Sequence, residues 1–167
     1  MTCKLDSLCY YAKGKVSVDT LDESTYVSTE NMLPDKAGIV RASTLPTVQY
    51  TQQYLKGDIL VSNIRPYFKK IWMAEYDGGC SNDILVFRVK SGCDPTFLYY
   101  VLSCDDFFNY ATATSKGTKM PRGDKVAIMQ YIVPDFNINT QSYISKCLKA
   151  FDNKIAMNKK INDNLAA

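Results

Sequence analysis

Three short runs of β-branched and aromatic residues in the middle of the chain have the length of strands. They cover residues 59–61, 71–72 and 84–87, and each is bounded by Gly, Pro, Asn or Asp, which is the pattern of strands separated by turns. In the turn between the first two runs, Pro66 has no N–H to donate to a central strand and directs Arg65 toward an extended conformation. The pattern therefore predicts three strands and a turn that presents cations and an aromatic ring at the end of a sheet.

The segments before these strands carry weaker patterns. Leu5, Leu8 and Tyr11 are spaced i, i+3 and i+6 and are followed by Gly14, which predicts a short amphipathic helix with a glycine stop. Residues 26–33 then predict an extended segment that ends at a Pro-Asp pair.

Further along, we expect a short strand over residues 37–42 and a connecting loop over residues 43–53, where residues of low strand propensity gather. After the sheet, Asp94 is a typical N-cap and Pro95 a typical first helical residue. They predict a helix whose apolar face packs on the core. A second helix is expected to begin near residue 105 and to end at the Thr and Ser residues that follow it.

A segment rich in glycine, hydroxyl and basic residues follows the second helix. Residues 115–125, SKGTKMPRGDK, hold two glycines, one proline and four cations against one acid, so we expect an exposed, mobile loop. It is either a solvated connection or a DNA contact, because its backbone N–H groups and side chains can approach phosphates and base edges. It is not a P-loop, since GxxxxGK[ST] is absent. Residues 126–133 then predict a final strand that Pro134 closes.

From Asn139 the pattern changes to a heptad repeat, with apolar residues at alternating steps of four and three. As one helix, this region of roughly 28 residues spans about 40 Å. Asparagine within such a seam specifies register and partner at a cost in stability. We therefore predict pairing with a specific helical partner; the alternative is that the helix folds back on its own domain. The seam consists of Ile144, Leu148, Phe151, Ile155, Asn158, Asn162 and Leu165.

Composition narrows the class of protein. The 167 residues are 46% hydrophobic and 22% charged, which is typical of one folded domain, with or without an appendage. The net charge of +3 is weak support for a polyanionic partner. An apolar run of about 18 residues and a signal-peptide pattern are both absent from the sequence, so we expect a cytoplasmic protein. Six cysteines without CxxC spacing predict reduced, packed thiols rather than zinc or disulfide sites.

The sequence offers no candidate catalytic site. It has no histidine, which removes the Ser-His-Asp and Cys-His arrangements and the commonest metal ligand. Asp35, Asp135 and Asp152 are too scattered in the sequence for a metal-dependent nuclease. The glycine-rich cofactor turn and the polar-Pro-Pro-aromatic loop of a DNA methyltransferase are also missing. We predict a protein that is not an enzyme and that binds neither cofactor nor metal.

Four stretches, in their order and spacing, resemble the specificity subunit of type I restriction-modification systems. They are GDILVSNIRPYFKKIW, GGCSNDILVFR, FLYYVLSCDDFFNYATATSKGTKMPRGDK and IVPDFNINTQSYISKCLKAFDNKIAMNKKINDNL. The resemblance extends from Tyr26 onward, and each stretch alone is only moderately specific. It implies a mixed α/β target-recognition domain that reads one half of a bipartite DNA sequence. It also implies that the following helix pairs with another such helix and sets the spacing between the half-sites.

The resemblance further implies partners. The specificity subunit of this family is not catalytic; it positions a methyltransferase subunit, which uses S-adenosylmethionine, and a restriction subunit, which uses ATP and magnesium. A complete subunit has two recognition domains and two helical regions, whereas this sequence has one of each. It is therefore either a half-subunit that forms a homodimer, or a fragment or silent cassette of a longer gene. We expect a β-rich α+β recognition domain with short helices in residues 1–138 and a long coiled-coil helix in residues 139–167.

Two groups of residues are the candidate contacts with double-stranded DNA. Their cations would supply salt-dependent affinity, and polar side chains would discriminate by about 1 to 3 kcal/mol for each bidentate base contact. Arg65 has an alternative role, because NIRP recurs in the framework of the family, so that Arg65 and Pro66 can hold the fold instead. One group of candidate contacts is Arg65, Tyr67, Lys69 and Lys70, and the other is Lys116, Thr118, Lys119 and Arg122.

The alternative function is a coiled-coil adaptor whose α/β domain docks protein without DNA. RNA binding is a distant third, since no RRM or KH pattern is present.

Overall fold

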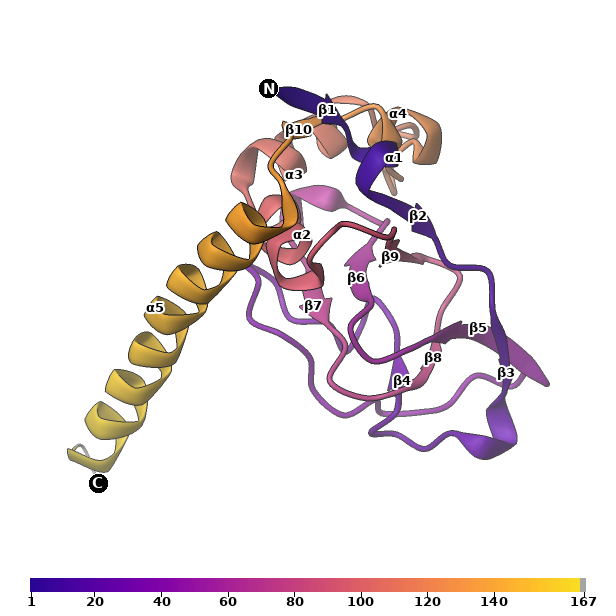
Figure 1. Ribbon diagram of the computed structural model, residues 1–167. Helices are drawn as coiled ribbons and strands as arrows, with labels where there is room; N and C mark the ends of the chain where they lie inside the picture. Colours follow the sequence, from indigo (N-terminus) through magenta and orange to yellow (C-terminus); the bar gives the residue numbers. More distant parts are fainter. Residues whose placement is uncertain (166–167) are drawn as a thin grey trace.

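Two four-stranded sheets and one two-stranded sheet are present in the structure, a computed structural model that describes residues 1–165. The central sheet has the strand order β2-β9-β6-β7, the second has the order β3-β5-β8-β4, and β1 pairs with β10 (Figure 1). The strands are β1 (Thr2–Lys4), β2 (Cys9–Tyr11), β3 (Lys15–Ser17), β4 (Tyr26–Val27), β5 (Tyr50–Tyr54), β6 (Ile59–Ser62), β7 (Ile71–Met73), β8 (Gly78–Cys80), β9 (Ile84–Val89) and β10 (Ile132–Pro134). The helices are α1 (Leu5–Leu8), α2 (Pro95–Leu102), α3 (Asp105–Ala113), α4 (Lys125–Met129) and α5 (Ile138–Leu165), with short 3-10 helices η1 (Val18–Thr20) and η2 (Pro66–Phe68).

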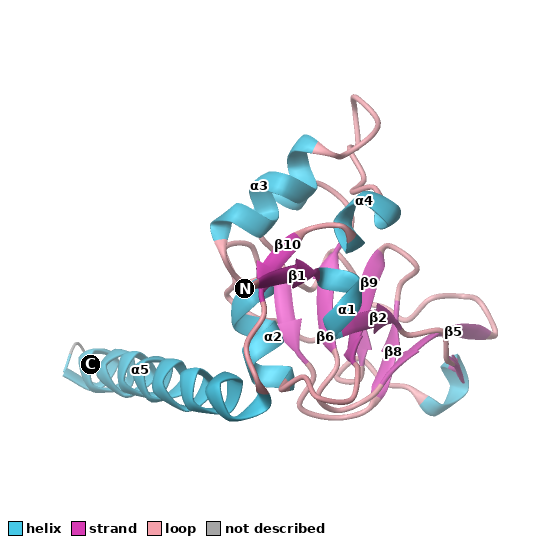
Figure 2. Ribbon diagram, turned by 45° about the horizontal axis from the view of Figure 1, so that its top comes forward, coloured by secondary structure: helices cyan, strands magenta, loops and turns pink. Residues whose placement is uncertain are grey.

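The central sheet is covered on both faces, by helices on one side and by the second sheet on the other (Figure 2). Strand β6 shows how its sequence produces this arrangement. Ile59 and Val61 pack into the same cluster as Phe107 of α3, whereas Leu60, between them, packs into the cluster that holds Tyr54 of β5. Burial of each such aliphatic side chain stabilises the fold by about 1.5 to 3 kcal/mol. The three predicted strands are β6, β7 and β9, and the predicted α+β fold with a long C-terminal helix is confirmed.

The second sheet depends on two adjacent glycines in β8. This strand is buried along its whole length and lies between β4 and β5, with β4 parallel to it. A Cβ atom on Gly79 would lie 2.7 Å from Cγ2 of Thr51, and one on Gly78 would collide with the backbone carbonyl oxygen of Thr25. Only glycine permits so close an approach of the neighbouring strands.

The two helices predicted after the sheet are present. The side chain of Asp94 accepts a hydrogen bond of 2.8 Å from the backbone N–H of Phe97, and Pro95 is the first residue of α2, as its N-cap pattern predicts. α3 begins at Asp105 and buries Phe108 against the helix-side cluster. Both helices pack on the same face of the central sheet, and the first turns of α5 pack against α2.

The predicted N-terminal helix is wrong beyond its first turn. α1 ends at Leu8, and the backbone of Cys9 is already extended, with φ of −148°. Tyr11, expected on the helix, belongs to β2 and lies opposite Phe87 of β9. The sequence Cys-Tyr-Tyr favours a strand, and the edge of β9 supplies the backbone hydrogen bonds that a strand needs.

The segments predicted as extended over residues 26–33 and 37–42 hold little regular strand. The first contains β4 and Met32, and the second contains only Ile39, which forms an isolated β-bridge with Met32. A buried side chain replaces the missing ladder: Nδ2 of Asn31 donates to the carbonyl oxygens of Tyr26 at 3.0 Å and Val40 at 2.9 Å. Asparagine often competes with regular structure in this way.

The loop predicted over residues 43–53 is wrong at its end, where β5 begins at Tyr50. β5 pairs with β3 on one side and β8 on the other. Thr51 and Tyr54 are buried, whereas Gln52 is partly exposed. The sequence of β5 contains threonine and glutamine and has no continuous apolar pattern. Its extended conformation is therefore decided by pairing with β3 and β8 rather than by local propensity.

The strand predicted over residues 126–133 is also wrong in its first half, which is helix α4. Asp124 caps this helix, because its Oδ1 accepts hydrogen bonds from the backbone N–H groups of Val126 at 2.9 Å and Ala127 at 3.2 Å. The β-branched Val126 is 76% exposed and has no place in a core. Only the second half forms a strand, β10, which pairs with β1.

Helix α5 begins on the domain and then projects away from it as a rod (Figure 1). Its root is anchored by two buried polar side chains. Oε1 of Gln141 accepts a hydrogen bond of 2.9 Å from the backbone N–H of Asp94, and Oγ of Ser145 donates to Oδ1 of the same residue at 2.9 Å. From residue 148 onward α5 is exposed along its length. None of the described helices is both long and apolar enough to cross a membrane.

The predicted division of the chain at residues 138 and 139 coincides with the start of α5. It stays a prediction, because the first turns of the helix pack against α2 and Ile144 touches the core. Residues 166–167, the end of the predicted helical region, lie outside the described residues.

Candidate nucleic-acid interface

The two predicted cationic segments, the turn after β6 and the loop between α3 and α4, lie side by side. The backbone N–H of Arg65 donates a hydrogen bond of 2.8 Å to the carbonyl oxygen of Pro121. Ile64 and Arg122 also form an antiparallel β-bridge. The fold therefore joins segments that are more than fifty residues apart in the sequence into one surface.

The loop is exposed, as predicted, but its base is fixed. Lys116 and Arg122 exchange two backbone hydrogen bonds of 2.9 Å each and close the loop as a narrow hairpin. Nζ of Lys116 lies 2.6 Å from a carboxylate oxygen of Asp124, which raises the pKa of this lysine. Between these ends, Thr118 and Lys119 are exposed and form no side-chain hydrogen bond or ion pair within residues 1–165. Figure 2 shows this loop projecting beyond α3 and α4.

Arg122 is the cation that connects the loop to the sheet. Its Nε lies 3.1 Å from Oδ1 of Asp83, in the turn between β8 and β9, and its side chain remains 53% exposed. An ion pair this exposed contributes at most about 1 kcal/mol to stability. The guanidinium group is thus oriented by Asp83 and still available to a ligand from solvent.

The turn of residues 65–69 is tighter than predicted. Arg65 has φ of 49° and is left-handed rather than extended, and Lys69 at the other end has φ of 52°. The 3-10 turn between them, closed by a 3.0 Å hydrogen bond from the N–H of Phe68 to the carbonyl of Arg65, explains the correction. Tyr67, which is 47% exposed, packs against Phe68 with ring centroids 4.8 Å apart and ring planes tilted by 53°.

The two lysines of this turn are already engaged with the protein. Nζ of Lys69 lies 3.1 Å from Oδ1 of Asp105, which also pairs with Lys36 at 2.9 Å. Nζ of Lys70 donates a hydrogen bond of 2.6 Å to the carbonyl oxygen of Thr29, and burial lowers the pKa of Lys70. Both lysines hold the turn against neighbouring segments, so the loop offers the freer cations.

Arg65 is partly enclosed at the junction of the turn and the loop. Its Nε and the nearby Oδ1 of Asn63 are buried and have no hydrogen-bond partner within the described part of the chain. The inner nitrogen of this guanidinium is enclosed, and the backbone of Arg65 is left-handed and bonded to Pro121. Both observations favour the framework role of Arg65 over base contact. Its assignment as a DNA contact stays a prediction.

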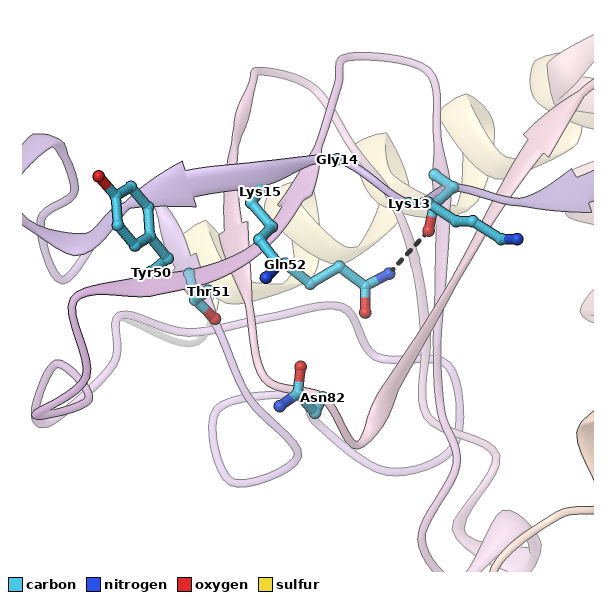
Figure 3. Close-up of a pocket in the computed structure, with 8 residues that line it drawn as sticks. Lys13, Gly14, Lys15, Tyr50, Thr51, Gln52 and Asn82 are labelled. Carbon is cyan, nitrogen blue, oxygen red and sulfur yellow. Dashed lines mark hydrogen bonds between the residues drawn. The ribbon is translucent and has the colours of Figure 1, made fainter.

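A further polar groove, which was not predicted from the sequence, lies at the β3 edge of the second sheet. Its volume is about 340 Å³, and no carboxylate lines it (Figure 3). The residues that line it come from the approach to β3, from β5 and from the turn after β8: Ala12, Lys13, Gly14, Lys15, Tyr50, Thr51, Gln52 and Asn82. The groove was missed because its residues come together only once β5 pairs with β3. The Lys-Gly-Lys sequence was the one available signal.

The comparison with known protein families decides what kind of domain this is. The profile described as "Type I restriction modification DNA specificity domain" matches residues 1–167, the whole of the chain. The chain belongs to this family. The specificity domain has no arrangement of three or more histidine, cysteine or carboxylate side chains suited to a metal among residues 1–165.

Individual relatives agree with this assignment. The specificity domain is 27% identical over 115 residues to the type I restriction enzyme EcoDI specificity subunit of Escherichia coli, a match that covers 68% of this chain and 26% of that protein. The fold is shared with the HsdS subunit from Thermoanaerobacter tengcongensis, with a TM-score of 0.73, 18% identity and coverage of 96% of this chain and 44% of that one. It is also shared with the S subunit from M. genitalium, with a TM-score of 0.60, 19% identity and coverage of 93% and 40%. The chain thus spans less than half the length of each of these proteins.

The predicted pairing residues of the specificity domain form an exposed stripe on α5, except at the root. Ile144 packs against the core, whereas Phe151 is 67% exposed and Ile155 is 54% exposed. Asn158 and Asn162 are exposed as well, so they are not buried by the domain itself. Ile161, which was not among the predicted pairing residues, is an exposed apolar residue that widens the stripe. The alternative that the whole helix folds back on its own domain is wrong beyond the root.

Proposed function

We propose that this specificity domain binds double-stranded DNA and reads one half of a bipartite target. The observation that carries the proposal is the exposed hairpin of residues 116–122, whose tip has free polar and basic groups and whose base is fixed to the sheet. A rigid base reduces the ordering cost of binding, while Lys119 and Arg122 can approach phosphates and base edges from solvent. Tyr67 extends this surface with an aromatic ring.

In this proposal α5 sets the distance between two half-sites. The helix is fixed in direction at its root and again by a hydrogen bond of 2.6 Å from the hydroxyl of Tyr100 to Asp152. Its exposed apolar stripe pairs antiparallel with the same stripe of a second copy, which places two recognition domains at opposite ends of a rod. A 28-residue helix is about 42 Å long. The target is then an inverted repeat with an unread gap.

The domain itself supplies specificity rather than catalysis. Methyl transfer and cleavage belong, in this proposal, to a methyltransferase subunit and a restriction subunit that the domain positions on DNA. One of the proteins that share its fold comes from a study of complex assembly of the type I restriction-modification system, with a TM-score of 0.71 and 19% identity over 96% of this chain and 44% of that one.

A salt titration with random-sequence duplex DNA tests the proposal. We expect the logarithm of the association constant to fall linearly with the logarithm of the salt concentration, by about 0.9 for each phosphate that a cation neutralises. Affinity that does not depend on ionic strength, or no measurable binding at low salt, would reject DNA recognition. That result would favour the coiled-coil adaptor, whose evidence is the same apolar stripe on α5.

A further inference from the structure

The strands β3 and β5 present one polar face to solvent. They are antiparallel neighbours in which Lys15 is the partner of Gln52, at the exposed edge of the second sheet. Because side chains alternate along a strand, Tyr50 lies on the same face as Gln52. Thr51, between them, is buried and donates a hydrogen bond of 2.5 Å to the carbonyl of Cys80. Lys13 and Asn82 complete the lining of the groove on this face (Figure 3).

The groups on this face are free to bind a ligand. Lys13 and Lys15 are exposed and form no ion pair within residues 1–165. Nε2 of Gln52 donates a weak hydrogen bond of 3.3 Å to the carbonyl of Ala12, which holds the amide over the groove and leaves its oxygen available (Figure 3). Asn82 is exposed on the facing turn. Two cations and two amides without a carboxylate are the donor and acceptor set that suits phosphates and base edges.

The face is continuous with the loop proposed above. Asn82, which lines the groove, is followed by Asp83, whose carboxylate holds Arg122 at 3.1 Å. The backbone carbonyl of Asp83 also accepts a hydrogen bond of 2.8 Å from the N–H of Asn63, beside the turn after β6. The turn after β8 therefore joins the groove to the loop. In Figure 1 this edge of the domain lies on the side away from α5, where a ligand does not meet the helix.

We infer that the groove between β3, β5 and the turn after β8 is a second DNA-contact surface that determines sequence preference; this inference rests on the proposed function. A pair of antiparallel strands fits the major groove of B-DNA, where each base pair shows a distinct pattern of donors and acceptors. Lys13 and Lys15 contact phosphates. The amides of Gln52 and Asn82 contact base edges, with the geometry that pairs an amide with adenine N6 and N7.

The first experiment measures the lysines with random-sequence duplex DNA and the full chain. The variant Lys13→Ala with Lys15→Ala is expected to reduce the slope of log affinity against log salt by about 1.8, which is two phosphate contacts. Lys4→Ala with Lys56→Ala is the matched control, because these two exposed lysines lie outside the groove and form no ion pair within the described residues. Circular dichroism checks that each variant is folded.

The second experiment measures the amides by selection from a random duplex library, followed by sequencing of the bound DNA. Gln52→Ala and Asn82→Ala are each expected to keep the wild-type salt slope. Each is expected to lose roughly 5- to 150-fold of the discrimination against wrong bases at the base pair that its amide contacts. Two outcomes are possible when wild-type protein binds DNA but the inference is wrong: the lysine variant keeps the wild-type slope, or the amide variants keep the wild-type preference. In either case the proposed function stands. If wild-type protein shows no salt-dependent binding, the proposed function itself fails.

Discussion

The backbone N–H of Arg65 donates a hydrogen bond to the carbonyl oxygen of Pro121 at 2.8 Å, and this bond joins the two cationic segments of the domain. It is a main-chain contact, so the junction does not depend on which side chains the loop carries. Residues 118–120, at the tip of the loop, can therefore change without loss of the base that supports them, whereas Gly117, with φ of 98°, is suited to glycine. In the proposed function, this division separates the support of the loop from the residues that contact DNA.

Charge reversal in the loop tests its role directly. Lys119→Glu combined with Arg122→Glu replaces two cations by two anions on the exposed hairpin. We expect the slope of log affinity against log salt to fall by about 1.8 or more and the affinity to drop, because two phosphate contacts are lost and two repulsions are added. Fluorescence anisotropy with a labelled random duplex at several salt concentrations measures both quantities.

The matched control for the loop variant is Lys4→Glu combined with Lys56→Glu. It changes the net charge equally, at two exposed lysines outside the proposed surface. A general electrostatic effect would weaken binding by both double variants to the same extent. Unchanged binding by the loop variant would show that the contact surface lies elsewhere on the domain.

Sequence patterns predicted the parts of the fold that local chemistry determines. The runs that became β6 and β9 are continuous and apolar because both faces of these strands are covered. Their lengths of 4 and 6 residues favour a strand over a buried helix. The Asp94-Pro95 pair predicted the start of α2 because the cap is made by the pair itself. The heptad spacing likewise predicted α5 to within one residue at its start.

What the sequence analysis missed depends on partners distant in the chain. β5 has a polar sequence and is a strand because β3 and β8 lie beside it. The groove that contains Lys15 and Asn82 follows from that pairing, so it could not be predicted before the strand was known. α4 was missed for a different reason: the β-branched Val126 suggested a strand, although the capping residue Asp124 was a local signal for a helix.

The exposed stripe on α5 predicts a dimer. Ile155→Asp places a charge in the middle of the stripe, where pairing would bury it, and the cost of burying an unpaired charge exceeds the gain from the contacts around it. We expect wild-type protein to sediment as a dimer at micromolar concentration and this variant to sediment as a monomer. Analytical ultracentrifugation measures the difference.

Ala156→Asp is the control for helix pairing, because it adds the same charge one residue away, outside the seam. It should remain dimeric, and circular dichroism should show the same helix content in both variants. Wild-type protein that is monomeric with its helix intact would contradict pairing between copies. The helix would then need a partner that is not a second copy of this chain.

Buried thiols predict a loss of stability at alkaline pH. Burial raises the pKa of Cys9, Cys80 and Cys93 to about 12, from an ordinary value of 9.0. Above pH 9 the unfolded chain therefore releases protons that the folded protein retains, and unfolding becomes more favourable. Each thiol should lower the free energy of unfolding by about 1.4 kcal/mol between pH 8 and pH 10.

Urea unfolding at pH 8, 9 and 10 measures this decline. Cys80→Ala should lower stability at every pH, because it leaves a cavity. It should also make the decline with pH shallower by the contribution of one thiol. A decline of equal steepness in the variant would mean that Cys80 does not retain its proton in the folded protein.

The central claim is that this domain reads DNA sequence, and selection from a random duplex library by the wild-type full chain tests it most directly. After several rounds and sequencing, the account predicts enrichment of one short motif, which occurs as an inverted repeat with a fixed gap when the protein is dimeric. A bound pool with the same base composition as the input at every position would contradict the account.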